Sequence, residues 1–207
     1  ICVTRKDIRD ITKSLFESKA RRNLELVEIH EHSPYVINAV VEIPKGCTAK
    51  YEYNPDLDTF QLDRCLPDSM HYPCSYGFVP STMGEDEDPL DVLIYDSVPL
   101  DRGTIVQCNV IGALDMEDSH GQDWKILGVP VYRGKEFWSL KDIDPMFLKI
   151  ADMFFKHYKD LEAQKKVTVR GWIDKKQALK IVDECCERFR PIDTLEEFLS
   201  KPIDQLG

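Results

Sequence analysis

Residues 84–96 read GEDEDPLDVLIYD, in which a dense group of carboxylates runs directly into an apolar segment. The carboxylates Glu85, Asp86, Glu87, Asp88 and Asp91 precede the apolar run at residues 92–95. Like charges at this spacing repel and raise one another's pKa unless a cation lies among them. The stretch therefore predicts a buried strand that is preceded by carboxylates, and these carboxylates require a positive counter-ion.

The length and composition of the chain are those of an ordinary single domain. The 207 residues are enough for one domain with a substantial core. The chain has 27 Lys and Arg against 37 Asp and Glu, a formal net charge of −10, which disfavours nucleic acids and other polyanions as partners unless metals mediate the contact. No apolar run approaches the ~20 residues that cross a bilayer, so we expect no membrane-spanning segment.

The cysteines indicate a reducing compartment. There are 7 of them, an odd number, without C-x-x-C spacing and with Cys185 and Cys186 adjacent in a helical pattern. This arrangement predicts neither a disulfide framework nor a zinc site. Because the sequence starts at Ile1, we expect further residues upstream, and with them any targeting segment.

Apolar residues at helical spacing predict three helices. The first covers residues 4–22, the second is capped by Asp144 with Pro145 in its first turn, and the third is capped by Asp174. A short helical tail is predicted at residues 193–200. The predicted buried faces are Ile8, Ile11, Leu15 and Ala20 in the first helix, Phe147, Ile150, Ala151, Phe154 and Leu161 in the second, and Ala178, Ile181, Val182, Cys185 and Phe189 in the third.

Most strands are predicted before the second and third helices. Residues 48–54 and 59–64 alternate around a turn at 54–56 and predict a hairpin. Strands followed by helices favour an α+β fold with a closed or strongly curved sheet. The other predicted strands are residues 35–44, 92–95, 104–114, 125–132 and 167–172.

The acidic loop leaves two interpretations open. It is not an EF-hand, because Leu90 stands where the third oxygen ligand belongs and Ser97 where the bidentate Glu belongs. It is either a solvated acidic loop or a site at which Asp86, Asp88 and Asp91 converge on Mg²⁺ or Mn²⁺, the cations that carboxylate oxygens suit.

A second acidic group lies in MEDSHGQDWK, residues 116–125, where Asp118 and Asp123 flank a turn at His120 and Gly121 and Lys125 follows. Taken alone, this segment is typical of a polar hairpin turn. Two acidic groups in one domain favour a site with several metal ions.

Cationic and phenolic side chains accompany the carboxylates. Lys50 and Glu52 lie on one face of a predicted strand and Tyr51 on the other. Taken singly, each such residue has a structural explanation, such as an ion pair, an aromatic core position or a cation at a helix C-terminus. The others are Arg64, Tyr72, Tyr76, Tyr158 and Lys159.

Together, these motifs resemble the soluble family I inorganic pyrophosphatases in order and spacing. The resemblance covers roughly residues 35–190, and its D-x-D-P-x-D-V core is the most specific part. The motifs are VEIP (41–44), KYE (50–52), DR (63–64), YPCSYGF (72–78), EDEDPLDVL (85–93), DSHGQDWK (118–125), HYKD (157–160) and VRGW (169–172).

The resemblance implies an OB-like five-stranded β-barrel with flanking α-helices. It implies hydrolysis of pyrophosphate to two phosphates with three or four Mg²⁺ ions, for which Mn²⁺ or Zn²⁺ can substitute. The expected organisation is an N-terminal helical extension at 1–30, a catalytic domain at 31–190 and a C-terminal extension at 191–207.

The resemblance also implies a role for each site residue. Asp88 resembles the general base and Tyr72 a supporting phenol, and Asp91 resembles a ligand shared by two metals. Ser119 departs from the pattern, since many relatives carry Glu or Gln there, and this puts the affinity of one metal in doubt. The implied metal ligands are Asp86, Asp91, Asp118, Asp123, Glu42 and Glu52, and the implied phosphate clamp is Lys50, Arg64, Tyr76, Lys125, Tyr158 and Lys159.

Several alternatives stay open. Short polyphosphate is a possible second substrate, and an acidic ion-binding or partner-docking module is the non-enzymatic alternative. We expect a homo-oligomer with added contacts through residues 1–30. The cytoplasm is the default localisation, with an acidic, polyphosphate-storing organelle, as in some protist relatives, as the alternative.

Overall fold

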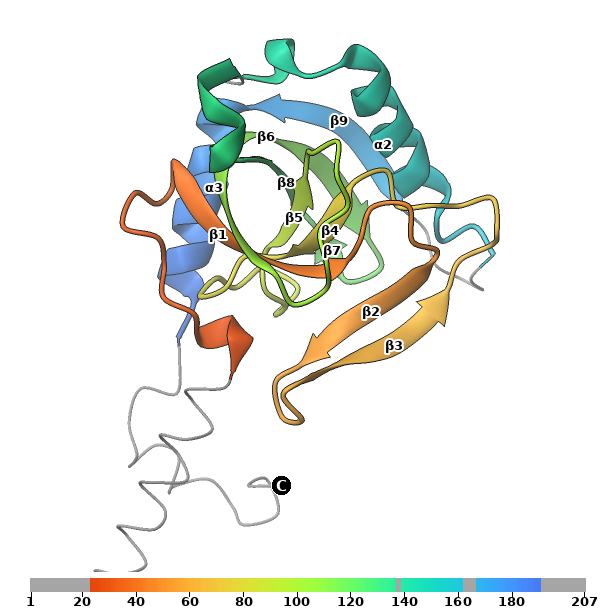
Figure 1. The fold of residues 1–207 in the computed structure, drawn as a ribbon, viewed down its shortest axis with the longest axis horizontal. Helices are drawn as coiled ribbons and strands as arrows, with labels where there is room; N and C mark the ends of the chain where they lie inside the picture. The colour runs from red at the N-terminus through yellow and green to blue at the C-terminus, as the bar shows by residue number, and fades with distance from the viewer. Residues whose placement is uncertain (1–22, 137–138, 162–166, 191–207) are drawn as a thin grey trace, which may run out of the picture.

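The structure is a computed structural model that describes residues 23–136, 139–161 and 167–190 (Figure 1). Most of these residues belong to strands. The strands are β1 Val36–Ile43, β2 Ala49–Asn54, β3 Thr59–Cys65, β4 Ser75–Phe78, β5 Asp91–Ile94, β6 Ile105–Asp118, β7 Gly121–Gln122, β8 Lys125–Pro130 and β9 Thr168–Asp174. The helices are α2 Pro145–His157 and α3 Lys175–Arg188, with 3₁₀ turns η1 Leu24–Leu26, η2 Val131–Glu136 and η3 Leu140–Asp142.

The main sheet has seven strands and closes on itself. The pairing runs β1–β4–β5–β8–β6, and β6 pairs back with β1, so these strands form a ring (Figure 1). β5 and β8 are parallel, and the other pairings in the ring are antiparallel. The α+β class and the strongly curved sheet predicted from the sequence are therefore confirmed.

The hairpin of β2 and β3 forms a separate two-stranded sheet beside the ring (Figure 1). Its strands match the predicted segments 48–54 and 59–64, and Asn54 pairs with Thr59 at the turn. Asn54 Oδ1 accepts hydrogen bonds from the backbone N–H groups of Asp56 and Leu57, which is why the chain reverses here.

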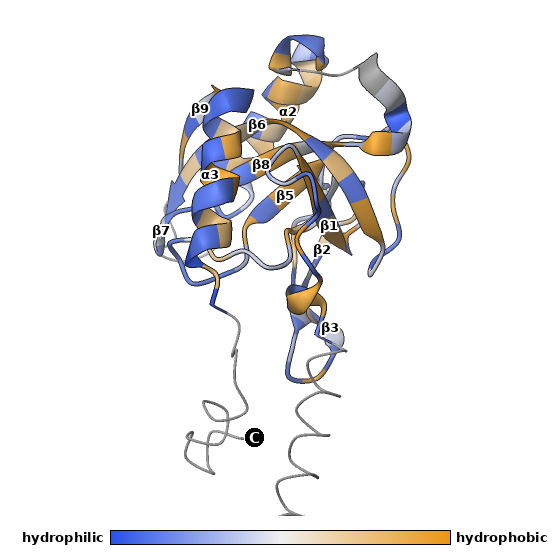
Figure 2. Cartoon of the chain, turned by 90° about the vertical axis from the view of Figure 1, so that its left-hand side faces the viewer, coloured by the Kyte–Doolittle hydropathy of each residue, from blue (hydrophilic) through white to orange (hydrophobic). Residues whose placement is uncertain are grey.

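Alternate residues of the ring strands pack into two clusters. Val92 and Ile94 belong to a cluster that contains Ile181 and Val182 of α3. Leu93, between them, belongs to a second cluster that contains Phe154 and Phe155 of α2. Because both faces of β5 are covered, its residues 92–94 are continuously apolar instead of alternating. The outward side of α3 is mostly hydrophilic in Figure 2.

Both helices begin where predicted. Asp144 Oδ1 accepts a hydrogen bond from the N–H of Met146, and Asp174 Oδ1 accepts one from the N–H of Gln177. Such caps satisfy N–H groups that have no partner inside the helix. The predicted buried residues of α3 are buried except Phe189, which follows the last helical residue and is only half-buried.

The predicted face of α2 was partly wrong. Ala151 and Phe154 are buried as predicted, but Ile150 is 49% exposed and Leu161, beyond the helix, is 83% exposed. Phe155 is buried in their place. The helix is rotated so that its aromatic residues reach the tyrosines of the ring, and Phe154 lies 4.8 Å from Tyr72 between ring centroids.

Other differences concern strand limits. Strand β4 was not predicted as a strand, β6 continues to Asp118 instead of ending at residue 114, and β8 ends at Pro130. The predicted helix at 4–22 and the helical tail at 193–200 lie outside the described residues. Among the residues that the structure describes, no helix is long and apolar enough to cross a membrane.

Candidate active site

One cavity of about 320 Å³ contains all the residues predicted for the site. The ring, the hairpin and the end of α2 each contribute to its lining. The predicted residues that line it are Glu42, Lys50, Glu52, Arg64, Tyr72, Tyr76, Asp86, Asp88, Asp91, Asp118, Asp123, Lys125, Tyr158 and Lys159. The fold thus brings together positions more than a hundred residues apart, while their individual roles stay predictions.

Sequence reasoning missed several residues of the lining. They include Glu25 from η1, Tyr53 from the hairpin, Asp63 and His120. Asp63 stands directly before Arg64 in the DR motif and accepts a 2.7 Å hydrogen bond from it, so the motif itself carried a signal. Glu25 lies in a segment without a motif, and only the fold brings it to the cavity.

Lys125 is the central cation of the acidic wall. It begins β8 directly beside Asp91, which begins the parallel strand β5. Its ammonium group contacts Asp91 Oδ2 and lies 2.5 Å from Asp123 Oδ1. The residue is only 2% exposed. Burial disfavours its charge, but the two carboxylates more than offset this effect and hold the pKa of Lys125 well above its usual value.

The acidic loop is folded tightly on itself. Gly84 N–H donates to Asp88 O at 2.7 Å, and Asp88 N–H donates to Asp86 Oδ1 at 3.3 Å. A Cβ atom at Gly84 would displace the Asp86 carboxylate from its present position. Glu85 and Glu87 are exposed.

The C-terminal end of α3 is hydrogen-bonded to the start of this loop. Met83 N–H donates to Cys185 O at 3.0 Å, and Arg188 Nη1 donates to Met83 O at 2.7 Å. The loop that carries Asp86 and Asp88 is therefore tied to a packed helix at its first residue.

Burial and mutual repulsion disfavour the negative charge of several carboxylates. Burial is the largest cause of the raised pKa of Asp86 and of Asp88, and at Asp88 the charges of Asp86 and Asp91 add to it. Burial also raises the pKa of Asp123, which Lys125 offsets only in part. Such shifts are what uncompensated like charges produce, and a further cation would relieve them.

The second acidic group lies where β6 turns into β7. Asp118 Oδ2 accepts a 2.7 Å hydrogen bond from Lys159, and its Oδ1 accepts one of 2.7 Å from the backbone N–H of His120. Although burial disfavours its charge, these donors lower the pKa of Asp118. Ser119 at the turn is exposed.

The hairpin supplies the opposite wall. The ammonium group of Lys50 contacts Glu52 Oε1 and lies 3.1 Å from Asp63 Oδ2. The guanidinium of Arg64 lies 5.8 Å from the ring centroid of Tyr158 at the end of α2. Lys50 and Glu52 therefore share one face of β2, as the alternation predicts.

The buried members of the site are held by hydrogen bonding and ring packing. Glu42 is 8% exposed, and its Oε1 accepts a 2.7 Å hydrogen bond from Tyr53 N–H. Burial raises the pKa of Glu42 to about 8. Tyr72 and Tyr76 pack with ring centroids 5.4 Å apart, and burial raises the pKa of both well above the usual value.

The chemistry of the lining fits a hard divalent cation. In the part of the chain that the structure describes, no three Asp, Glu, His or Cys side chains are gathered closely enough to hold an ion as they stand. Lysines lie among the carboxylates instead, as Lys125 does between Asp91 and Asp123. The donors are nevertheless carboxylate oxygens around a shared cavity, which is the donor type that Mg²⁺ takes.

Known proteins match this chain over most of its length. The family model described as inorganic pyrophosphatase matches residues 39–190. The inorganic pyrophosphatase of Thermus thermophilus is 41% identical over 172 residues, which cover 81% of this chain and 98% of that protein. Its counterpart in Buchnera aphidicola is 42% identical, over 75% of this chain and 92% of that protein.

Solved structures agree with this match. A crystal structure of the inorganic pyrophosphatase from Thermus thermophilus superposes with a TM-score of 0.78 at 41% identity, covering 82% of this chain and 99% of that one. The structure of an inorganic pyrophosphatase from Coxiella burnetii gives a TM-score of 0.72 at 43% identity, with 75% and 95% covered. Since sequence, fold and cavity agree, the chain belongs to the inorganic pyrophosphatase family.

Proposed function

We propose that this chain hydrolyses inorganic pyrophosphate to two phosphates in the cavity between the ring and the hairpin. The observation that carries the proposal is the single cavity that every predicted site residue lines. Acidic and basic side chains lie side by side in its wall, as Lys125 does with Asp91 and Asp123. This wall suits a substrate that is bound both through metals and through cationic side chains.

The acidic residues are proposed as the metal ligands. They are Asp86, Asp91, Asp118, Asp123, Glu42 and Glu52, all of which line the cavity. Bound Mg²⁺ would screen the charge of the substrate and lower the pKa of a bound water. The number of ions, three or four, and replacement by Mn²⁺ or Zn²⁺ belong to the proposal.

Asp88 is proposed as the general base. Its carboxylate is next to the ligand group but forms no ion pair among those found within the described residues. Its pKa is raised by burial and by its acidic neighbours, and a base is most effective when its pKa approaches the working pH. Asp88 would take the proton of the attacking water.

The cationic and phenolic residues are proposed to hold the two phosphates. Lys50 and Arg64 approach from the hairpin, and Lys125 and Lys159 from the ring side and the end of α2. They would stabilise charge that develops on the transferred and departing groups. Tyr76 and Tyr158 would donate hydrogen bonds through their hydroxyl groups, with Tyr72 as a supporting phenol.

Further points belong to the same proposal. We infer that the ring is an OB-like barrel, that residues 31–190 form the catalytic domain and that residues 1–30 and 191–207 are extensions. Assembly as a homo-oligomer and location in the cytoplasm also follow from the resemblance. Tripolyphosphate is the substrate to compare for activity on short polyphosphates.

The test is phosphate release from pyrophosphate by the purified chain. With millimolar Mg²⁺ we expect phosphate to be released, and with EDTA in place of Mg²⁺ we expect none. Protein without phosphate release at any Mg²⁺, Mn²⁺ or Zn²⁺ concentration, but with bound metal in equilibrium dialysis, would support an ion-binding module instead of an enzyme.

A further inference from the structure

The hairpin holds part of the proposed phosphate clamp without belonging to the ring. In the described residues, β2 and β3 form ladder pairs only with each other. Yet Lys50, Glu52 and Arg64 line the cavity from this hairpin. The short connection from β1 and the backbone hydrogen bond from Tyr72 N–H to Cys47 O hold the base of the hairpin. Along its length, side-chain contacts with the ring help to set the distance of these residues from the ring.

One of these contacts comes from Arg102, in the connection between β5 and β6. Its guanidinium carbon lies 3.3 Å from the centroid of the Tyr51 ring, and its Nε donates a 2.7 Å hydrogen bond to Glu42 O on β1. Arg102 thus contacts β1 and β2 at once. A guanidinium stacked on an aromatic face gains both cation–π attraction and packing.

The turn that presents Arg102 is itself well fixed. Gly103 N–H donates to Val41 O at 2.8 Å, and Thr104 N–H donates to Asp101 O at 3.1 Å. Gly103 has φ +83°, which favours glycine, and a Cβ there would lie 3.5 Å from the Phe60 ring of the hairpin. The turn is therefore anchored to β1 and lies against the hairpin.

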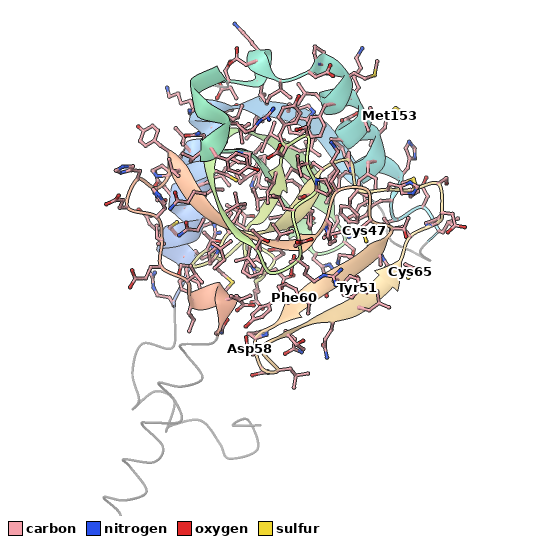
Figure 3. All side chains as sticks on the ribbon, viewed as in Figure 1. Cys47, Tyr51, Asp58, Phe60, Cys65 and Met153 are labelled. Atoms are coloured by element: carbon pink, nitrogen blue, oxygen red, sulfur yellow. The ribbon has the colours of Figure 1, made fainter. Side chains whose placement is uncertain are left out.

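Arg102 contacts the face of the hairpin opposite to the face that carries Lys50 and Glu52. Successive side chains of a strand point to opposite faces, so Tyr51 is on the opposite face from Lys50 and Glu52. Figure 3 shows Tyr51 and Phe60 along the hairpin. Neither Tyr51 nor Arg102 is among the residues that line the cavity. Arg102 therefore lies outside the cavity in which the substrate would bind.

A second contact fixes the same strand two residues further on. Tyr53 N–H donates to Glu42 Oε1, and the Tyr53 ring packs against Phe60 and Phe78 with centroids 5.3 and 6.0 Å apart. Tyr53 anchors the middle of the hairpin, whereas Tyr51 lies next to Lys50. Arg102 lies outside the cavity, and the residue that it contacts, Tyr51, is adjacent in sequence to the clamp residue Lys50.

We propose that Arg102 is a positioning residue, which holds Tyr51 and thereby keeps the hairpin residues Lys50 and Arg64 at the distance that pyrophosphate binding requires. This inference rests on the clamp role proposed for Lys50 and Arg64. It adds a residue that lies outside the cavity and outside the motifs.

The first experiment compares Arg102→Ala with the native chain at saturating Mg²⁺. We expect KM for pyrophosphate to rise about threefold to tenfold while kcat changes less than about twofold, because uniform binding is lost while the proposed base Asp88 and the proposed shared ligand Asp91 stay in place. Tyr51→Phe retains the aromatic face and should keep the native KM, whereas Tyr51→Ala should reproduce the effect of Arg102→Ala.

The matched control is Arg133→Ala. Arg133 is an arginine near a carboxylate, with its Nε 4.0 Å from Asp96, and it does not line the cavity. Its KM should stay native. An unchanged KM in Arg102→Ala, or an equal rise in Arg133→Ala, would overturn the inference.

A double-mutant cycle separates this inference from the proposed function. If Arg102 acts through the clamp, Arg102→Ala should raise KM less in a Lys50→Ala background than in the native one. If the effects of Arg102→Ala and Lys50→Ala on KM were fully additive, the effect of Arg102→Ala would be assigned to general stability, and the inference would be overturned. If Lys50→Ala leaves KM native, the clamp role of Lys50 fails, and a rise in Arg102→Ala would then support positioning through Arg64.

Discussion

Every residue of β8 in the ring is buried, whereas in β3 of the hairpin, described over its whole length, none is. Both strands nevertheless line the same cavity, β8 through Lys125 and β3 through Arg64. The acidic wall is therefore built on strands that are packed on both faces. The hairpin wall is built on a two-stranded sheet held by a few side-chain contacts.

This difference suits the two kinds of ligand, although the proposed metal ligand Glu52 lies on the hairpin and the proposed clamp residue Lys125 on the ring. Metal coordination tolerates little displacement of the carboxylates, so rigid strand ends such as that of Asp91 are an appropriate support. Phosphate groups are larger and bind long, flexible cationic side chains, so a less tightly packed element can carry Lys50 and Arg64. We expect substitutions in the ring to change turnover and stability, and substitutions in the hairpin to change mainly substrate affinity.

The largest effect is expected from Asp91→Asn, on the ring side. Asp91 begins β5 and contacts Lys125, and loss of its charge would remove the proposed ligand shared by two metals. Phosphate release at millimolar Mg²⁺ should fall roughly 100-fold or more. Glu85→Gln, an exposed carboxylate of the same loop, is the control and should retain activity. Similar rates for both variants would contradict the ligand role of Asp91.

The variants Lys125→Ala and Lys50→Ala show how much each wall of the cavity contributes to the free energy of unfolding. Removal of the buried Lys125 leaves two carboxylates without their cation, so without metal ions the free energy of unfolding should fall by about 3–5 kcal/mol. Lys50→Ala removes a cation from the more exposed hairpin and should cost about 1 kcal/mol or less. Urea unfolding measures both, and equal losses would abolish the distinction between the walls.

Gly77→Ala tests the packing of the ring itself. A Cβ at Gly77 would overlap Val40 O and lie 2.8 Å from Val40 C, so β4 could not keep its distance from β1. We expect a loss of about 1–3 kcal/mol in unfolding free energy. Leu62→Ala in the hairpin, where the side chain is 54% exposed, should change it by no more than about 0.5 kcal/mol. A native melting temperature for Gly77→Ala would contradict this account.

The smallest effect is expected from Ser119→Glu at the turn between β6 and β7. A carboxylate beside Asp118 should lower the Mg²⁺ concentration for half-maximal activity by about threefold to tenfold. Ser69→Glu, also exposed but away from the cavity, controls for the added charge. An unchanged Mg²⁺ titration for Ser119→Glu would remove this position from the metal site.

Much of the candidate site was predictable because its residues lie in short motifs. Asp86, Asp88 and Asp91 are close in sequence, and the alternation of Lys50, Tyr51 and Glu52 fixes their faces before any tertiary contact forms. The family resemblance then connected motifs that periodicity alone cannot connect. The hairpin was also predictable, because its turn residues act through local hydrogen bonds.

Other features depended on packing between distant segments. The short strand β4 is buried at every position, so it lacks the alternation by which strands are recognised. The buried face of α2 was predicted with Ile150 and Leu161, which are exposed, and without Phe155, which is buried against Tyr76 of the ring. Residues such as Glu25 reach the cavity only through the fold.

The sequence by itself determined which chemical groups the site contains, the hairpin and the caps of both main helices, because these depend on residues a few positions apart. Only the tertiary structure decided that Lys125 lies between Asp91 and Asp123, and that Arg102 stacks on Tyr51. The contacts of Lys125 with Asp91 and of Arg102 with Tyr51 join segments separated by tens of residues. Their geometry follows from the closure of the sheet into a ring, which no local pattern specifies.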